Sequence, residues 1–393
     1  MEWKHYKMDE LIEEISMGPF GSDVKKEFYV DNGVPILNGS NLQGFKLKED
    51  SFGYLTKEKA DSLKKCNAHR GDIIVTHRGT LGQIVYVPVN SKYDRYVISQ
   101  SQFRFRCKAD LVDVQYLVYY FHTREGQYKI LANASQVGVP ALARATSTFR
   151  LIDIKLPPLD DQRRIASILS SLDRKIELNN KINADLDEMA QAIFKNWFVD
   201  FEPFKDGKFV NSELGMIPEG WKVGLLGELC NFKRGKNLLT KNAIDEGIPV
   251  VAGGLEPSCY HNVANTGAPV ITVSGSGANA GFMRMYHVPV WASDCSFIDI
   301  SCENFYFVYC FLKVNSKLLK HAQTGAVQPH VKPSDIHDFE LVIPDKESIY
   351  DFQDKVKPFF DKIALIQKEN SRLSLLRDTL LPRLMSGELE VPE

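Results

Sequence analysis

The chain lacks the features that define several common classes of protein. No apolar run reaches the roughly 18 residues that a membrane span needs, and the charged start MEWKHYKMDELIEE is unlike a secretory signal. The seven cysteines are odd in number and form no CxxC pair, which indicates reduced thiols in a cytoplasm. With 393 residues, 44% hydrophobic and 25% charged, the composition is typical of a soluble globular protein with two domains.

Motifs of common catalytic sites are missing as well. The sequence has no Walker lysine motif, no HExxH, no GxSxG and no Asn/Asp-Pro-Pro-aromatic motif of an amino-methyltransferase. Segment 275–281 has the spacing GxGxxxG and precedes a strand-like run, so it does not match a dinucleotide loop. We therefore expect no catalytic, cofactor or metal site here. A catalytic site assembled from distant residues is the alternative.

What the sequence does contain is an internal repeat. Short segments of the first half return in the same order in the second half, and the offset between them shrinks along the chain. Such a pattern predicts two related modules, the second with shorter loops, and hence two copies of one surface. The matched segments are Trp3-Lys4 with Trp221-Lys222, 34–36 with 248–250, 73–76 and Gly79 with 270–273 and Gly275, 116–121 with 306–311, Gln136 with Gln323, and Leu156-Pro157 with Ile343-Pro344.

A long helical pattern follows each module. Apolar residues recur at alternating steps of three and four, which is the seam of a coiled coil, and one asparagine stands at a matching seam position in each copy. The alternative is a solvated helix face with an accidental asparagine. The predicted seam and partner-docking residues are Ile165, Leu169, Leu172, Ile176, Asn183, Leu186 and Ile193 in the first copy, and Phe352, Val356, Phe359, Ile363, Ile366, Asn370, Leu373 and Leu380 in the second.

The positions of proline and glycine predict some of the ends of the two helices. The first is expected from about 160 to 198, roughly 58 Å at 1.5 Å per residue, because Pro203 and Gly207 would stop it. In the second, Pro358 lacks an N–H group, so we expect the main helix to begin there after a separate short one. A helix from there to residue 381 measures about 36 Å, close to one turn of B-DNA, which suggests a ruler between two modules.

Two matched sets of loops offer polar side chains for phosphates or base edges. Glycines allow close backbone approach, arginine can read guanine, and asparagine or glutamine can read adenine. A plain glycine-rich hairpin and solvated charge clusters are the alternatives, and the net charge of −2 argues mildly against a nucleic-acid role. The candidates are Thr76, His77, Arg78, Gly79, Thr80, Gln83, Arg104 and Gln136 in the first module, and Lys233, Arg234, Lys236, Ser274, Ser276, Asn279, Gln323, Thr324, Gln328 and His330 in the second.

Three segments, 157–203, 324–344 and 375–389, resemble the specificity subunit of type I restriction-modification systems. The resemblance covers the whole chain. It implies an α+β fold in which two repeat-related mixed α/β target-recognition domains are separated by two long antiparallel coiled-coil helices, with internal pseudo-twofold symmetry. The expected boundaries are 1–156 for the first domain, 157–202 for the central helix, 203–343 for the second domain with a linker at 203–216, and 344–393 for the C-terminal helix.

The same resemblance implies a non-catalytic subunit that recognises double-stranded DNA. Each domain would read one half of a bipartite sequence, while the helices set the spacer and dock two methyltransferase subunits, directing adenine methylation or restriction. Endonuclease-translocase subunits would complete the assembly. Those partners would bring S-adenosylmethionine, ATP and magnesium, and this chain would bring no cofactor and no membrane contact. A protein-binding scaffold and a self-contained restriction or methylation enzyme are the alternatives.

Overall fold

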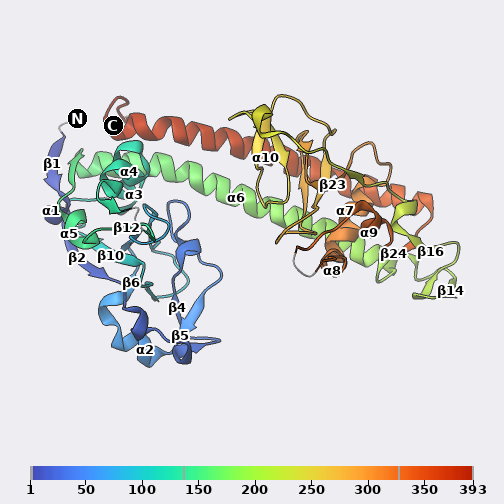
Figure 1. Cartoon of the computed structure of the whole chain (residues 1–393), viewed down its shortest axis with the longest axis horizontal. Coiled ribbons are helices and arrows are strands. Elements are labelled where there is room, and N and C mark those ends of the chain that lie inside the picture. Colours follow the sequence, from blue (N-terminus) through green and yellow to red (C-terminus); the bar gives the residue numbers. More distant parts are fainter. Residues whose placement is uncertain (1–2, 136–137, 326–327, 392–393) are drawn as a thin grey trace. The chain divides into compact units, whose positions relative to one another are not determined.

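The computed structural model describes residues 3–135, 138–325 and 328–391 and divides into two compact units (Figure 1). Unit 1 consists of Met1–Glu177 with Asn370–Glu393, and unit 2 of Leu178–Glu369. Two long helices, α6 (Leu159–Phe198) and α10 (Lys346–Ser386), each contribute to both units. No helix among the described residues is long and apolar enough to cross a membrane.

A four-stranded antiparallel sheet forms the centre of unit 1. Its strand order is β2-β10-β7-β8, and the IIVT sequence of β7 is fully buried, as a short apolar run predicts. A largely aromatic helix, α3, packs into the same core, to which both long helices add residues. The bounds are β2 (Ile12–Met17), β10 (Gln102–Cys107), β7 (Ile73–Thr76), β8 (Ile84–Tyr86) and α3 (Val114–His122).

Smaller elements surround this sheet. A mixed five-stranded sheet has the order β3-β5-β4-β9-β6, and β1 pairs with β13 and β11 with β12. The strands are β1 (Lys4–Lys7), β3 (Tyr29–Val30), β4 (Val34–Ile36), β5 (Gly53–Leu55), β6 (Asn67–His69), β9 (Arg95–Val97), β11 (Ala134–Ser135), β12 (Ala141–Leu142) and β13 (Asp153–Leu156). The helices are α1 (Met8–Leu11), α2 (Lys57–Ser62), α4 (Arg124–Leu131) and α5 (Ala145–Arg150).

Unit 2 has a central sheet with the corresponding order, β17-β23-β20-β21, and a three-stranded sheet, β19-β18-β22. β16 pairs with β24 and β14 with β15. The strands are β14 (Phe209–Ser212), β15 (Gly215–Pro218), β16 (Lys222–Leu225), β17 (Lys233–Arg234), β18 (Ile248–Val251), β19 (Cys259–His261), β20 (Val270–Ser274), β21 (Met283–Tyr286), β22 (Trp291–Ala292), β23 (Cys295–Asp299) and β24 (Glu340–Ile343). The helices are α7 (Phe305–Val314), α8 (Ser316–His321) and α9 (Pro333–His337).

Within each unit, α6 and α10 run antiparallel and contact each other. In unit 1 the beginning of α6 faces the end of α10, where Asp173 and Arg377 form an ion pair at 2.7 Å. In unit 2 the buried Asn179 donates a hydrogen bond from Nδ2 to Glu369 Oε2 at 2.8 Å. All of the seam residues named from the sequence, Asn183 and Asn370 among them, are buried or half-buried.

Proline 358 does not interrupt α10. The predicted break there is wrong, because α10 runs from Lys346 to Ser386 as one helix. Phe352 and Val356 before the proline and Phe360 after it are all buried in the core of unit 2, so packing along one face holds the helix together. Pro358 itself is exposed, and water can therefore solvate the carbonyl group that lost its N–H partner.

Candidate nucleic-acid interface

In unit 1, four segments meet at one end of the central sheet, and we call this group tip 1. They are the strand end 17–21, the turns 77–83 and 99–102, and the loop 138–144. Three backbone hydrogen bonds join them, from Gly18 N to Gln102 O (2.8 Å), from His77 N to Ser101 O (2.9 Å) and from Gly79 N to Pro140 O (2.9 Å). The sequence therefore folds so that the glycine-rich turn and the later loop form one surface.

Unit 2 carries a corresponding group, tip 2. It comprises segments 234–237, 275–282 and 292–295 and the described residues of 323–331. Its backbone hydrogen bonds run from Gly235 N to Cys295 O (2.8 Å), from Gly275 N to Asp294 O (3.0 Å) and from Gly277 N to Pro329 O (3.1 Å). The bonding pattern matches Gly79 with Gly277. The sequence match of Gly79 with Gly275 was therefore wrong by two residues, because Thr76 and His77 correspond to Ser274 and Gly275 in this bonding pattern.

Some predicted residues of tip 1 support the backbone rather than face outward. Thr76 Oγ1 donates to Gln83 Oε1 at 3.0 Å, and Gln83 Nε2 donates to Gly39 O at 3.2 Å. His77 is half-buried, with its ring nitrogen Nε2 3.2 Å from Gln100 O. Burial lowers the pKa of His77, although that hydrogen bond partly opposes the shift.

The exposed part of tip 1 is the turn itself. Arg78, Gly79 and Thr80 are exposed, and a backbone bridge between Arg78 and Ala141 fixes the start of the turn. Gly79 has a φ of 87°, a conformation that side chains with a Cβ atom rarely adopt. Arg78 and Thr80 can therefore reach a ligand from a backbone that is already held in place.

In tip 2 an acidic residue organises the polar side chains. Asp294 accepts hydrogen bonds from the guanidinium group of Arg234 and from the hydroxyl group of Ser276. No sequence motif singles out Asp294, because its hydrogen-bond partners are 60 and 18 residues away. A carboxylate between these two donors fixes where the arginine can point.

Among the other predicted residues of tip 2, some bond to backbone groups and others are exposed. Asn279 Nδ2 donates to Gly253 O at 3.3 Å, and Gln323 Nε2 donates to Ala280 O at 2.8 Å. Thr324 N donates to His330 O at 3.0 Å, and His330 N donates to Thr324 O at 2.8 Å. Gln328, between these two residues in the sequence, is exposed. Lys233 and Lys236 are exposed, whereas Ser274 Oγ is buried without a partner among the described residues.

Two predicted residues do not join the tips. Arg104 is only 3% exposed, and its guanidinium group bonds to Glu14 at 2.6 Å and to the fully buried Asp72 at 3.3 Å. Because this network neutralises Arg104 inside the fold, we do not include it in the interface. Gln136 lies outside the described residues. Sequence reasoning also missed Phe20, which is 80% exposed next to Gly18 and Pro19.

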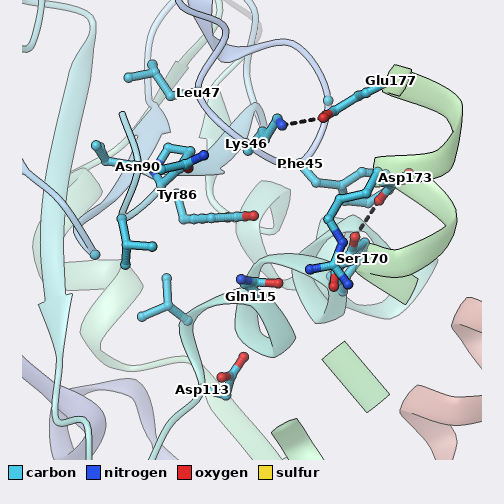
Figure 2. A pocket seen from close by; sticks show the side chains of 18 of the residues that line it. Phe45, Lys46, Leu47, Tyr86, Asn90, Asp113, Gln115, Ser170, Asp173 and Glu177 are labelled. Carbon is cyan, nitrogen blue, oxygen red and sulfur yellow. Dashed lines mark hydrogen bonds and ion pairs between the residues drawn. The ribbon is translucent and has the colours of Figure 1, made fainter. Parts of the chain in front are cut away.

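A cleft of about 1080 Å³ lies elsewhere in unit 1, between α6 and the loop that carries Phe45 and Lys46 (Figure 2). Lys46 pairs with Glu177, and Asp173 accepts a hydrogen bond from the Tyr119 hydroxyl group. Desolvation and the neighbouring Asp173 both raise the pKa of Tyr119, which therefore stays protonated. Because these charges of both signs pair with each other, we do not assign the cleft to nucleic acid.

The fold thus carries two similar loop groups, tip 1 and tip 2, each held by corresponding backbone hydrogen bonds. A family profile described as "Type I restriction modification DNA specificity domain" matches residues 1–188 and 218–375. The chain therefore belongs to this family. Its role is DNA-sequence recognition as the specificity subunit of a type I restriction-modification system, not catalysis. The predicted resemblance is thus confirmed.

Curated relatives agree over nearly the whole chain. The sequence is 30% identical to the type I restriction enzyme MjaIX specificity subunit of Methanocaldococcus jannaschii, over 100% of this chain and 94% of that protein. It is 24% identical to the HindI specificity subunit of Haemophilus influenzae, over 99% of this chain and 100% of that protein. The crystal structure of an S subunit from M. genitalium superimposes with a TM-score of 0.58 at 20% identity, covering 98% of this chain and 96% of that one, which supports the fold.

Proposed function

We propose that tip 1 and tip 2 each read one half of a bipartite DNA sequence. The observation that carries this proposal is that corresponding backbone hydrogen bonds hold both tips while their exposed side chains differ. A shared backbone with unequal side chains suits two different half-sites. We further propose that the two units are related by the internal pseudo-twofold symmetry that the repeat predicts.

The chemistry of the exposed side chains fits base and phosphate contacts. Arg78 and Arg234 can each form paired hydrogen bonds with guanine, and Thr80 and Gln328 can contact base edges or phosphates. Lys236 can neutralise a phosphate, which would make binding depend on salt. The overall charge of −2 is compatible with this proposal, because exposed cations can make a surface locally positive in a chain whose total charge is near zero.

We also propose that α6 and α10 set the spacer between the half-sites and dock two methyltransferase subunits. Seam packing accounts for the buried face of each helix, but large apolar side chains also face solvent. Leu375 on α10 is 69% exposed in unit 1, and Leu365 on the same helix is 65% exposed in unit 2. Exposed apolar residues of this size are typical of surfaces that bind other proteins.

In this proposal the partners complete the chemistry. The methyltransferase subunits would bring S-adenosylmethionine for adenine methylation, and endonuclease-translocase subunits would bring ATP and magnesium for restriction. This chain would contribute sequence recognition and no cofactor of its own. Because the proposed target is the cell's DNA, we expect the assembly in the cytoplasm.

Methylation mapping of host DNA tests the proposal directly. With the methyltransferase gene retained, deletion of this gene should abolish methylation of one bipartite motif. Exchange of residues 1–155 for those of a relative should then change one half-site and leave the other intact. Simultaneous loss of both half-sites would contradict the two-reader proposal. Absence of DNA binding by the reconstituted complex would favour the protein-scaffold alternative.

A further inference from the structure

The two tips differ most at the strand end next to the shared glycine. In tip 2, Gly235 is flanked by the exposed cations Arg234 and Lys236. In tip 1 the flanking residues of Gly18 are apolar, and Met17 is 39% exposed. Phe20 follows two residues later with 80% of its surface exposed. Tip 1 thus presents the side chains of Met17 and Phe20 where tip 2 presents Lys236 and the Arg234–Asp294 ion pair.

Local contacts hold the segment that carries Phe20. Phe20 N donates to Asp23 Oδ2 at 3.2 Å, and Asp23 N donates back to Phe20 O at 2.9 Å. The next residue, Gly21, lies against the side chain of Gln100, and the carbonyl group of Gln100 contacts His77. Phe20 is therefore part of tip 1, close in the structure to the glycine-rich turn, and its backbone is fixed before any ligand arrives.

We propose that Phe20 is a specificity-determining residue that contacts the C5-methyl group of a thymine in the half-site read by tip 1. This inference rests on the proposed function. Among the base-edge groups of the major groove, the thymine methyl group is the apolar one, and phenylalanine is a side chain suited to contact it. A large exposed aromatic ring gains by covering that methyl group, whereas it gains nothing from a phosphate or from the polar edge of guanine.

The test uses the reconstituted complex with its methyltransferase subunits and duplexes carrying the mapped motif. Each thymine of the tip 1 half-site is replaced singly by uracil, which removes only the methyl group. The wild-type complex should bind one of these duplexes about three- to fivefold more weakly, as expected for losing one buried methyl group. With Phe20→Ser the thymine and uracil duplexes should bind equally, whereas Phe20→Leu should retain the preference for thymine.

Controls separate the contact from a general effect. Leu151→Ser removes another exposed apolar side chain of unit 1, outside tip 1, and should keep the full thymine preference. Uracil in the half-site read by tip 2 should affect wild type and Phe20→Ser equally. Because Phe20 is 80% exposed, its replacement should leave folding and complex assembly intact.

Several results would overturn the inference. They are an unchanged uracil sensitivity in Phe20→Ser, a uniform loss of binding across all duplexes, or a half-site with no A·T pair beyond that of the methylated adenine. A Phe20-dependent rise in 2-aminopurine fluorescence would instead identify a wedge between base pairs and would also overturn it. If no bipartite motif depends on this gene, the proposed function fails as well, and the mapping experiment shows that separately.

Discussion

Tip 1 and tip 2 show how one backbone arrangement carries two kinds of surface. Gly18 in unit 1 and Gly235 in unit 2 make the same backbone hydrogen bond across the sheet, each at 2.8 Å. A side-chain amide supports the neighbouring turn in both tips, from Gln83 in one and from Asn279 in the other. The shared features are thus hydrogen bonds to backbone groups, which do not depend on the DNA sequence read.

The differences lie in the exposed residues around those contacts. Phe20 gives tip 1 an apolar side chain, while Arg234 and Lys236 give tip 2 positive charge. Tip 2 adds Asp294 as a carboxylate support for its arginine. The comparison teaches that the glycines preserve the position of each reading surface and that their neighbours are free to set its chemistry.

The largest effect is expected from filling the shared glycine positions. A Cβ atom on Gly18 would lie 1.9 Å from Ser99 O, and one on Gly235 would lie 2.2 Å from Ser293 O. Both contacts are to backbone, so the strands must shift, and Gly18→Ala and Gly235→Ala should each lower the free energy of unfolding by about 3 kcal/mol. Urea unfolding of each variant measures the change.

Gly39→Ala is the matched control, because its Cβ atom would meet nothing closer than Thr80 Oγ1 at 3.6 Å. It should change the free energy of unfolding by less than about 0.5 kcal/mol. If Gly18→Ala lowers the free energy of unfolding no more than this control does, the close packing of Gly18 against the Ser99 backbone does not stabilise the fold. If Gly18→Ala and Gly235→Ala lower the free energy of unfolding by very different amounts, the two glycines do not play the same structural role in the two tips.

An intermediate effect is expected from Arg234, the side chain that most distinguishes tip 2. If Arg234 pairs with guanine, Arg234→Ala should cost about 1–3 kcal/mol of discrimination at one base position. Asp294→Ala should cause part of the same loss, because the arginine then lacks its carboxylate support. Binding of the whole complex to duplexes varied at single positions measures the discrimination.

Lys233→Ala serves as the control beside it, since Lys233 is an exposed cation on the same short strand, β17, and has the opposite side-chain direction. It should weaken binding to all duplexes alike or leave it unchanged. The half-site read by tip 1 should keep its preferences in every one of these variants. A uniform loss for Arg234→Ala would identify a phosphate contact in place of a base contact.

Local sequence patterns were enough to predict the first long helix but not the start of the second. The first helix was expected from about 160 to 198, and α6 runs from Leu159 to Phe198. Its seam follows a regular spacing, and the burial of Ile165 and Leu169 reflects that spacing directly. Pro358 was misjudged because its local penalty was weighed without the core contacts of Phe352 and Phe360.

The interface was harder to predict, because it depends on contacts between distant segments. Arg104 resembled a surface cation until the fold placed it against Asp72, a residue 32 positions away. Asp294 and Phe20 belong to no motif. Asp294 is held in tip 2 by its own bonds to Arg234 and Gly275, and Phe20 lies in tip 1 through the bonds of its neighbours. The glycine-rich turns were recognisable as turns, but segment 275–282 holds three glycines, and only the backbone hydrogen bonds show that Gly277 is the one that matches Gly79.

The smallest effect is a pH dependence that each unit should show through half-buried histidines, tested at His122 in unit 1 and at His287 in unit 2. Burial lowers the pKa of His122 in unit 1, although the hydrogen bond between its Nε2 atom and Ile84 O, at 2.9 Å, partly opposes the shift. Burial also lowers the pKa of His287 in unit 2, although Asp361 and Asp187 partly oppose the shift. In the unfolded chain both histidines should protonate near their ordinary pKa of about 6.5.

Below about pH 6.5 the unfolded state therefore binds more protons than the folded state, so stability should fall as the pH drops toward the folded pKa values. Above that pH these two groups should contribute no slope. His122→Asn removes one titrating group and should make the decline shallower, as measured by urea midpoints between pH 7.5 and 5.5. His287→Asn should do the same for unit 2. If the urea midpoint falls with pH as steeply in both variants as in the wild type, these histidines do not account for the acid sensitivity. If it becomes shallower in only one variant, the histidine of that unit alone accounts for it.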